Sequence, residues 1–393
     1  MTTTKNNEHK KLNVPNLRFP EFQGEWEYFL IDDVCSEFKS GKNIKADSIS
    51  ESGEYPVYGG NGLRGYTSSY NHDGLYVLIG RQGALCGNVR PVYGKTYITE
   101  HAIAVAGNEI SNTSFLHQLF LKMNLGQYSD QSAQPGLAVN KLLKLKVALP
   151  SVLEQTKIAS LLSLLDERIT TQNKIIDKLQ SLIKGLEDNL LDNPLWEKTY
   201  LRSFMQFFST NSLSWEQLSY EEGEIRNLHY GLIHGFQTRG INSASLPMIK
   251  NEAIPKQYTL CQVGDVAFAD ASEDTGEIAK SVEFVDTIEG DTICGLHTIH
   301  GRDIKNTTVV GFKGFAFNSR YFHNQIKRLA QGTKVFSITS NNLSSCYVYL
   351  PDLETQKAIV ELLKAYEAQL IVSRKTLKQY EKQKQYLLSQ MFI

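Results

Sequence analysis

The hydrophobic positions of residues 158–190 recur in steps of four and three, which is the heptad pattern of a helix that packs along one seam. The pattern predicts a long helix within residues 151–193, ended by Asn193-Pro194. Each buried methylene contributes about 0.8 kcal/mol, so we expect this apolar stripe to pack against a partner. The seam positions are Ile158, Leu162, Leu165, Ile169, Gln172, Ile176, Leu179, Ile183, Leu186 and Leu190.

The same pattern returns at the end of the chain, shifted by 201 positions. Leu149 matches Leu350, Gln155 matches Gln356, and more than forty residues align without a gap. A chain that repeats a long helix, with a large block before each copy, is typical of two halves of one design. The second seam comprises Ile359, Leu363, Tyr366, Leu370, Ser373, Leu377, Tyr380, Lys384, Leu387 and Met391.

Each helix is the obvious partner for the other. The polar slots Gln172 and Ser373 lie near the middle of their helices, so an antiparallel pair would bring them together and fix its register. The thirty-three residues from Ile158 to Leu190 correspond to roughly 50 Å of helix. In the alternative, the two helices are unrelated and each packs only on its own globular block.

The block before the first helix has a β-rich pattern. Short β-prone runs at 55–58, 75–79 and 97–99 are separated by glycine-rich turns, and Trp26 starts the core. A helix is expected over 115–125 and a last strand over 144–149.

The second block repeats this skeleton with a growing offset. Leu195-Trp196-Glu197 echoes Glu25-Trp26-Glu27 at 170 positions, and His297 follows His101 at 196. Because the helices are offset by 201, the second block contains about thirty more residues. Two modules with one architecture and different ligands would diverge in this way. Strands are expected in this block at 266–268, 281–285 and 308–310.

Length and composition place the chain among ordinary globular proteins. With 393 residues it can hold two or three domains, and its net charge of −1 indicates no general affinity for polyanions. A nucleic-acid partner would therefore require cationic side chains gathered on one face. The five cysteines form no CxxC pair, which favours reduced thiols and does not favour zinc. No apolar run is long enough to span a membrane, and the polar residues 1–14 are expected to be a disordered lead-in.

Three short motifs resemble catalytic, cofactor or metal sites of other proteins, but the residues around each motif do not support that function. Gly60-x-Gly62-x-x-Gly65 matches the dinucleotide fingerprint, but the residues that follow it do not form a helix. Asn193-Pro194-Leu195-Trp196 resembles an amino-methyltransferase motif, yet it ends a heptad helix. His297 and His300 have no acidic third ligand at a metal-binding spacing. The sequence therefore provides no convincing active site.

What remains are planar, amide and cationic side chains in the loops of both blocks. Arginine pairs bidentately with guanine, asparagine and glutamine pair with adenine, and lysine binds phosphate. In the first block the candidates for DNA contact are Arg64, Tyr66, Tyr70, Arg81, Gln82, Asn88, Arg90, Lys95, Gln131 and Gln134. In the second block they are His229, Tyr230, His234, Arg239, Asn242, Arg302, Arg320, Lys334 and Ser337.

Longer phrases resemble the specificity subunit of type I restriction-modification systems. LPSVLEQTKIASLL and LPDLETQKAIVELL are similar to the family's helix openings, although Ser151-Val152 adds one residue and Thr355 replaces a glutamate. The resemblance covers nearly the whole chain. The other phrases are VPNLRFPEFQGEW (14–26), YPVYGGNG (55–62), IGRQGALCGNV (79–89), TEHA (99–102) and SAQPGLAVNKL (132–142).

The resemblance implies an α+β fold with a pseudo-two-fold internal repeat. Two globular α/β target recognition domains would be separated by a pair of long antiparallel coiled-coil helices. The implied boundaries are 15–150 and 194–350 for the recognition domains, and 151–193 and 351–393 for the helical spacers.

The resemblance also implies a function. Each recognition domain would read one half of a bipartite double-stranded DNA target, while the helices would set the spacer and dock two modification subunits. The chain itself would be non-catalytic and bind no cofactor or metal. S-adenosylmethionine, ATP and Mg²⁺ would act through the modification and restriction subunits, in the bacterial cytoplasm.

Two other classes of function stay open. A self-contained methyltransferase or nuclease would need a cofactor motif or a spaced acidic cluster. A scaffold would use the helices to join two modules that do not bind DNA.

Overall fold

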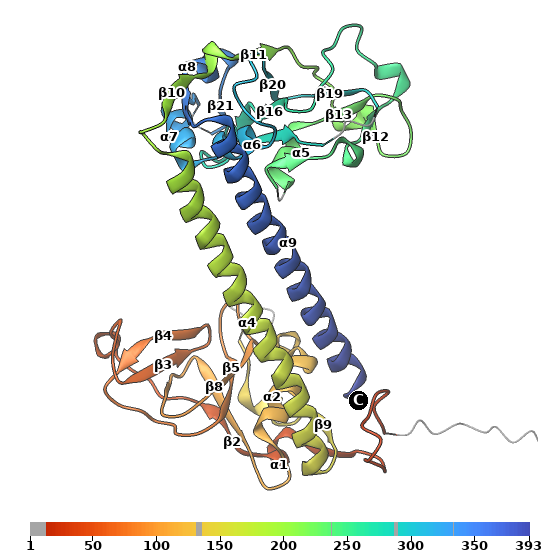
Figure 1. Cartoon of the computed structure of the whole chain (residues 1–393). Coiled ribbons are helices and arrows are strands. Elements are labelled where there is room, and N and C mark those ends of the chain that lie inside the picture. Colours follow the sequence, from red (N-terminus) through yellow and green to blue (C-terminus); the bar gives the residue numbers. More distant parts are fainter. Residues whose placement is uncertain (1–12, 131–135, 237, 287–289, 333) are drawn as a thin grey trace, which may run out of the picture. The chain divides into compact units, whose positions relative to one another are not determined.

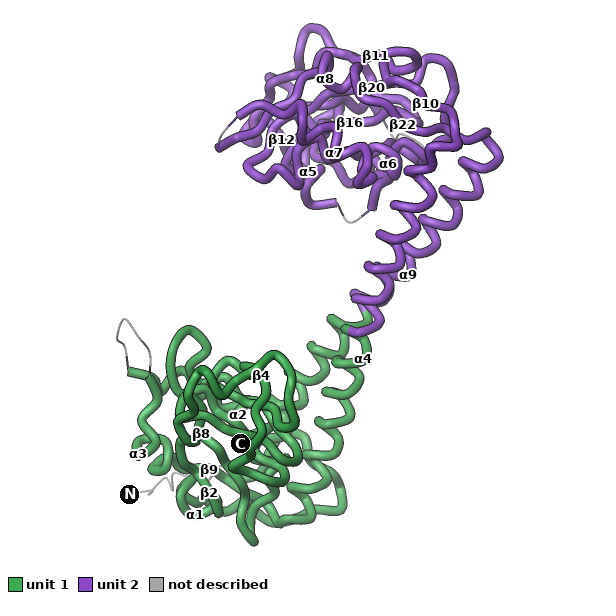
Figure 2. Tube along the Cα trace, turned by 90° about the vertical axis from the view of Figure 1, so that its left-hand side faces the viewer, with its two compact units in different colours: residues 1–173, 376–393 green, residues 174–375 purple. Residues whose placement is uncertain are grey.

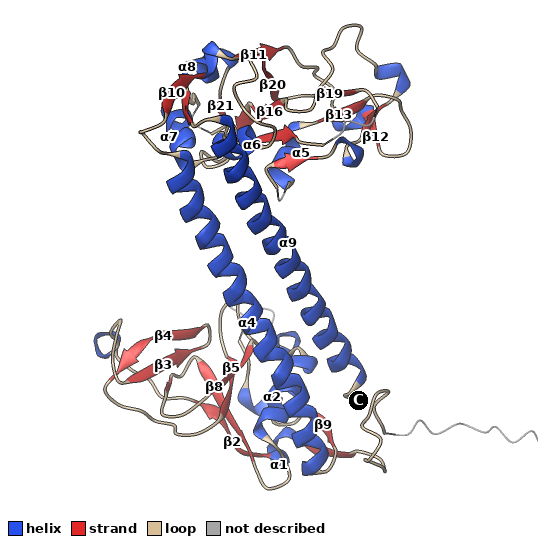
Figure 3. Cartoon of the chain, in the orientation of Figure 1, coloured by secondary structure: helices blue, strands red, loops and turns tan. Residues whose placement is uncertain are grey.

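The computed structural model describes residues 13–130, 136–236, 238–286, 290–332 and 334–393. The chain divides into two compact units (Figure 2). Unit 1 comprises the chain up to Asn173 together with Thr376–Ile393, and unit 2 comprises Lys174–Lys375. Both units combine sheets with part of two long helices, α4 (Val152–Leu191) and α9 (Leu353–Gln390) (Figures 1 and 3). The mixed α and β content and both heptad helices are confirmed.

Unit 1 is built around an antiparallel sheet with the strand order β2-β8-β5-β6. The strands are β2 (Cys35–Ser40), β8 (Ala102–Gly107), β5 (Tyr76–Gly80) and β6 (Val89–Val92). A second sheet contains β4 (Gly62–Thr67), β3 (Tyr55–Gly59) and β7 (Tyr97–Ile98), and a third pairs β1 (Glu27–Leu30) with β9 (Lys146–Leu149). The helices are α1 (Ile31–Val34), α2 (Thr113–Met123) and α3 (Val139–Leu142).

The core of unit 1 contains residues from the first block and from the segment around the end of α9. Trp26 packs edge-to-face on Phe115 and Phe392, with ring centroids 6.0 and 6.3 Å apart. Because Phe392 follows α9, the second long helix packs on the first block, which excludes the alternative that each helix packs only on its own block.

A polar network explains why lysine interrupts the second seam. Lys384 Nζ on α9 lies 2.5 Å from Asp166 Oδ1 on α4, and Gln118 Nε2 on α2 donates to Asp166 Oδ2 at 2.9 Å. Arg168 lies over the ring of Tyr380, so the two helices run in opposite directions within unit 1.

Unit 2 contains a five-stranded sheet with the order β11-β20-β16-β18-β14. Its strands are β11 (Met205–Phe208), β20 (Thr298–Asp303), β16 (Val266–Ala269), β18 (Ser281–Phe284) and β14 (Gly240–Ile241). A four-stranded sheet contains β12 (Leu218–Ser219), β15 (Met248–Ile249), β13 (Arg226–Leu228) and β19 (Thr292–Cys294). Two pairs are β10 (Glu197–Tyr200) with β22 (Tyr347–Leu350), and β17 (Ala271–Ser272) with β21 (Phe336–Ser337). The helices are α5 (Tyr230–Gly235), α6 (Phe312–Ala316), α7 (Arg320–Leu329) and α8 (Ser340–Ser345).

The predicted elements agree with the structure except at residues 308–310. The helix over 115–125 is α2, and the strand over 144–149 is β9. The predicted strand at 308–310 is wrong because its polar groups bond to side chains instead of a neighbouring strand. Thr308 N and Oγ1 donate to Asp303 Oδ2, and Val309 N donates to Gln356 Oε1.

The two units repeat one another in strand register as well as in sequence. In unit 1, Glu27 of β1 lies opposite Leu149 of β9, and in unit 2, Glu197 of β10 lies opposite Leu350 of β22. The order β2-β8-β5-β6 recurs as β11-β20-β16-β18. The internal repeat expected from the sequence offsets is therefore a repeat of the fold.

A buried glutamine makes the same three hydrogen bonds in both units. Gln155 Nε2 donates to Ile110 O and Pro150 O, and its Oε1 accepts from Asn112 N, at 2.8–2.9 Å. Its counterpart Gln356 donates to Thr307 O and Pro351 O and accepts from Val309 N, at 2.9–3.1 Å. Each glutamine thus ties the start of a long helix to the loop that packs beside it.

Candidate nucleic-acid interface

In unit 1, the loop that follows β5 crosses the start of β8. Arg81 N donates to His101 O at 2.9 Å, and Leu137 N donates to Arg81 O at 2.9 Å. His101 Nδ1 lies 3.2 Å from Gln82 Oε1, and Arg81 Nη1 donates to Ser40 Oγ at 3.1 Å. The crossing therefore brings the predicted residues Arg81 and Gln82 beside a histidine.

The tip of the β3–β4 hairpin lies against the same crossing. A Cβ on Gly60 would be 2.7 Å from His101 O, and one on Gly62, whose φ is +111°, would be 2.2 Å from Arg90 Nη1. Only glycine fits at these two positions. The close approach adds Arg90 and the exposed Arg64 of β4 to the group. We call Arg64, Arg81, Gln82, Arg90 and His101 reading surface 1.

The other candidates of unit 1 lie apart or outside the described residues. Lys95 Nζ lies 4.8 Å from the ring centroid of the exposed Tyr70, which packs against Tyr55 at 5.0 Å. Tyr66 is half-buried in β4, and Asn88 is half-buried in the loop after β5. Gln131 and Gln134 fall outside the residues that the structure describes.

Unit 2 contains the same crossing with different side chains. Asp270 N donates to His297 O at 3.0 Å, and Ile338 N donates to Asp270 O at 2.9 Å, so Asp270 occupies the place of Arg81. Ala271 pairs with Ser337 in unit 2, and the equivalent bridge in unit 1 joins Gln82 to Gly136. His297 Nδ1 lies 3.1 Å from Asp270 Oδ1, so this histidine contacts the residue at the Arg81 position, whereas His101 of unit 1 contacts Gln82, one position later.

Aromatic rings lie around the crossing of unit 2. The Tyr230 ring centroid is 5.3 Å from that of His297 and 4.8 Å from that of His229, and the exposed Trp215 lies 4.4 Å from His229. His229 itself is buried and caps α5, and burial together with His297 lowers its pKa. We call Trp215, Tyr230, Asp270 and His297 reading surface 2.

Sequence reasoning missed four residues of the two surfaces, namely His101, Trp215, Asp270 and His297. His101 and His297 are 196 positions apart, which is the local offset of the repeat. A histidine kept at the same position in two otherwise diverged blocks is a signal that could have identified both residues.

The structure gives other predicted residues of unit 2 internal partners. Arg302 donates to both carboxylate oxygens of the buried Asp265 at 2.7–2.8 Å and lies over Phe208. Asn242 caps a short helix by accepting from Ala244 N at 2.8 Å. His234 Nδ1 lies 3.1 Å from Glu277 Oε2. Lys334 and Ser337 are exposed.

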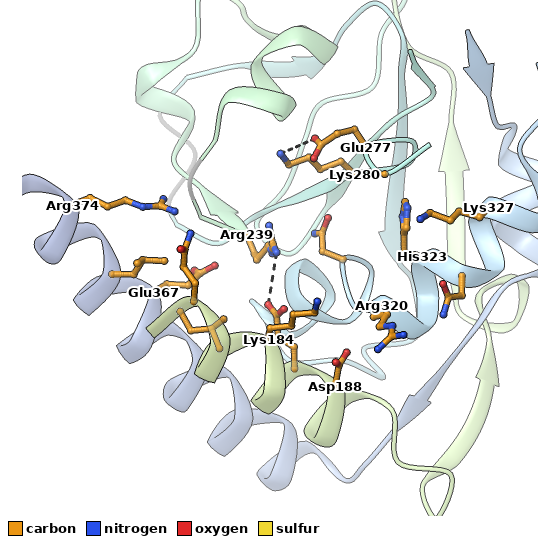
Figure 4. Close-up of a pocket in the computed structure, with 17 residues that line it drawn as sticks. Lys184, Asp188, Arg239, Glu277, Lys280, Arg320, His323, Lys327, Glu367 and Arg374 are labelled. Atoms are coloured by element: carbon orange, nitrogen blue, oxygen red, sulfur yellow. Dashed lines mark hydrogen bonds and ion pairs between the residues drawn. The ribbon is translucent and has the colours of Figure 1, made fainter. Parts of the chain in front are cut away.

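Arg239 and Arg320 line a groove of about 750 Å³ in unit 2 (Figure 4). Six lysine or arginine side chains and four carboxylates line it, so the groove is basic overall. Arg239 Nη2 lies 3.8 Å from Glu187 Oε1 on α4. Burial raises the pKa of Glu187 and raises that of Glu367 on α9 to about 7, which reduces their negative charge at neutral pH. The ionisable lining residues are Lys184, Glu187, Asp188, Arg239, Glu277, Lys280, Arg320, His323, Lys327, Glu367 and Arg374.

The seam residues predicted over 158–179 and 359–380 are all buried or half-buried. Ser373 is buried, and Gln172 is half-buried. The meeting of these two residues stays a prediction, because they belong to different units.

Three side chains of unit 2 could hold a metal ion. Cys261, Cys294 and His300 are buried, and their ligand atoms lie within 4.8 Å of one another. All five cysteines are free thiols. Over the described residues, we find no helix with the length and apolar character that a membrane crossing requires.

Comparisons with known proteins agree with these observations. Residues 23–181 and 304–382, more than half of the chain, match the family described as "Type I restriction modification DNA specificity domain". The chain is 46% identical over 180 residues to the EcoprrI specificity subunit of Escherichia coli, which covers 45% of this chain and 44% of that relative. The match thus spans less than half the length of that curated relative. The relatives named here are specificity subunits, a non-catalytic class of DNA-recognition proteins.

Two further proteins are similar over almost the full length. The MjaVIII specificity subunit of Methanocaldococcus jannaschii is 24% identical over 407 aligned positions, covering 95% of this chain and 92% of that relative. The crystal structure of the type I restriction-modification S subunit from M. genitalium has the same fold, with a TM-score of 0.67 at 15% identity, over 97% of this chain and 99% of that one.

Proposed function

Because the chain belongs to the family of type I restriction-modification DNA specificity domains, we propose that it reads the DNA target of a type I restriction-modification complex. In this role it directs adenine methylation, or restriction of unmodified DNA, by subunits that it positions. S-adenosylmethionine, ATP and Mg²⁺ then act through the modification and restriction subunits.

One observation supports a bipartite target above all others. The same backbone crossing occurs in both units, but unit 1 places Arg81 and Gln82 where unit 2 places Asp270 and Ala271. A shared frame with different donors and acceptors suits two recognition domains that read different half-sites. The domains would extend over 15–150 and 194–350.

The chemistry of each surface matches base edges in the major groove. Arginine and glutamine of reading surface 1 suit the acceptors of guanine and the donor–acceptor pair of adenine. The carboxylate of Asp270 accepts hydrogen bonds, as the amino group of cytosine requires, and Tyr230 adds an aromatic face. Different half-site sequences follow from these differences.

The basic groove of unit 2 suits the phosphate backbone. Arg320 and Lys327 of α7 and Lys184 of α4 lie along it (Figure 4). Phosphate contacts hold a reader in register without selecting bases, which is what an unread spacer needs. The near-zero net charge leaves a share of the phosphate grip to partner subunits.

The long helices serve as an antiparallel coiled-coil spacer and as the dock for two modification subunits. Large apolar side chains remain exposed on α4 and α9, where a soluble helix would place polar ones. In unit 1, Leu153 is 77% exposed and Leu164 is 57% exposed, and in unit 2, Val372 is 61% exposed. Val152 of α4 is 41% exposed and its repeat counterpart Leu353 of α9 is 51% exposed, so each unit offers an exposed apolar position to one of two copies of a partner.

Methylome sequencing of cells that carry the whole system tests the two-surface proposal. Arg64→Ala in unit 1 should relax one half-site, and His297→Ala in unit 2 should relax the other, each by roughly 1–3 kcal/mol of discrimination. Lys382→Ala, at an exposed position on α9, is the control and should leave the motif intact. Relaxation of both half-sites by either variant would contradict two separate readers.

A matched insertion tests the spacer. Four extra residues in α4 and four in α9 lengthen each helix by about 6 Å, or one to two base pairs at roughly 3.4 Å each. We expect a longer unread spacer between unchanged half-sites. An unchanged spacer in a variant that still assembles and methylates would refute the ruler role. Methyl transfer from labelled S-adenosylmethionine to DNA by the purified chain alone would favour an enzyme instead.

A further inference from the structure

Two strands of unit 2 and the loop before β16 bring two cysteines and a histidine together inside the domain. Cys261 precedes β16, Cys294 ends β19 and His300 lies in β20. Their side chains are 6%, 3% and 1% exposed. Neither the sequence spacing nor the family match points to this group, because the contacts form across strands.

The separation of the sulfur atoms suits a shared metal ion. Cys261 Sγ and Cys294 Sγ lie 3.6 Å apart, far beyond the roughly 2.05 Å of a disulfide bond. Two thiolates bound to one tetrahedral zinc ion at about 2.3 Å each lie roughly 3.7–3.8 Å apart. The thiols therefore already have almost the spacing that zinc requires.

The histidine is held as metal-ligating histidines usually are. His300 Nε2 lies 2.7 Å from Asp265 Oδ2, and Asp265 is itself bonded by Arg302 and by Gln262 N. A carboxylate bonded to one ring nitrogen fixes the imidazole and favours metal binding through the other nitrogen.

The equivalent place in unit 1 has a different, self-contained network. His72 N donates to Thr96 O as Cys261 N donates to Thr292 O, so His72 and Cys261 occupy the same position. Both ring nitrogens of His72 already have partners, Asn71 Oδ1 at 2.6 Å and Glu37 Oε1 at 2.9 Å. At this position unit 2 has a thiol in place of an imidazole whose two nitrogens are already paired, and zinc binds soft sulfur ligands readily.

An ion could enter from a neighbouring cavity. Cys294 is among the residues that line a cavity of about 470 Å³, together with Phe208, Asn211 and Tyr258. A water molecule from this cavity could complete a tetrahedral set.

We propose that Cys261, Cys294 and His300 form a zinc site in unit 2, with the fourth position left for a water molecule. His297 of reading surface 2 lies between two of the three ligands in the sequence. The ion would therefore clamp the turn that presents His297, by linking β19 to β20. This proposal does not depend on the proposed function, since zinc binding can be measured without DNA.

Zinc content tests the site directly. The full chain is expressed in zinc-supplemented medium, purified without a metal-affinity resin, and measured by inductively coupled plasma mass spectrometry. We expect about one zinc per chain for the wild type and less than about a tenth of that for Cys294→Ser. Cys346→Ser is the matched control, because Cys346 is also buried in unit 2 but contacts Asn342 O. It should retain the zinc of the wild type.

A cobalt titration of the wild type keeps the test independent of how well the variants fold. Co²⁺ added to the zinc-free chain should produce thiolate-to-cobalt charge-transfer absorption and the intense visible bands of tetrahedral cobalt, and zinc should displace it. Chelation should also lower the unfolding temperature. The proposal would be overturned by a wild-type chain that contains no zinc and shows no cobalt absorption. It would also be overturned by a Cys261–Cys294 disulfide found by mass spectrometry, or by full zinc content in Cys294→Ser.

Discussion

Replacing Gln155 with leucine should loosen unit 1 and leave unit 2 intact. The change keeps the side-chain volume close to that of glutamine but removes the acceptor of Asn112 N and the donor to Ile110 O and Pro150 O. Gln155 is fully buried, and its hydrogen bonds are part-buried, so water can replace it at these partners only in part. A buried unsatisfied donor costs about 1–3 kcal/mol, and each orphaned carbonyl adds less because it retains other contacts. We therefore expect a loss of about 2–4 kcal/mol.

Hydrogen exchange followed by mass spectrometry resolves the two units in one experiment. A loss of about 2–4 kcal/mol raises the opening constant of unit 1 roughly 30- to 1000-fold, since about 1.4 kcal/mol corresponds to a factor of ten. Peptides from β5 and β8 should exchange faster, whereas those from β16 and β20 should not. Gln356→Leu should produce the reverse pattern.

An exposed glutamine provides the control for this pair. Gln379 lies on the solvent side of α9, and Gln379→Leu should change stability by no more than about 0.5 kcal/mol. Equal loosening of both units by Gln155→Leu would show that the glutamine does not act within its own unit. No loosening by either buried variant would refute the hydrogen-bond reasoning.

Three further predictions concern pH and salt. Burial lowers the pKa of His117 to about 4, so the unfolded chain binds the proton at a higher pH than the folded chain does. The free energy of unfolding should therefore fall, by at most about 3 kcal/mol, as pH drops from 6.5 towards 4. Urea denaturation curves of His117→Gln should not show this loss. Burial raises the pKa of Glu367 to about 7, so the folded chain holds the proton more tightly than the unfolded chain does. The free energy of unfolding should therefore fall, by at most about 3 kcal/mol, as pH rises from about 4.5 to 7. Glu367→Gln should remove this pH dependence, which is opposite in sign to that of His117. Arg320→Ala should lower the salt slope of DNA binding by the assembled complex by about 1, whereas Lys382→Ala should leave it unchanged in the same titration. Variant curves that parallel the wild type would contradict each of these assignments.

The sequence selected candidates for DNA contact by residue type and by expected loop position, although Arg64 lies in β4 and Arg90 in β6, and their contact with DNA stays a prediction. Arg64, Arg81, Gln82 and Arg90 do converge on one surface of unit 1. Arg302 matched the same criteria, yet it is paired with a buried aspartate 37 positions away. A residue type shows what a side chain can bind, but the fold decides whether its partner is DNA or the protein itself.

The predicted strand at 308–310 failed for a similar reason. Thr308 and Val309 have high β propensity, but Gln356 and Asp303 already supply hydrogen-bond partners for their backbone amides. Propensity describes a preference of the local chain, and the side-chain contacts from Asp303, five positions away, and from the distant Gln356 outweigh it.

The sequence by itself determined the long helices, the β-rich blocks and their duplication. These features follow from periodicity and from offsets such as that of Gln155 and Gln356, which are properties of neighbouring residues or of two aligned copies. The tertiary structure decided which distant residues meet. Arg81, His101 and Leu137 share one crossing, and Cys261 in the loop before β16 approaches His300 of β20, because sheet order and strand register place them there. No local pattern encodes those distances, so only the folded chain identifies the two surfaces and the proposed metal site.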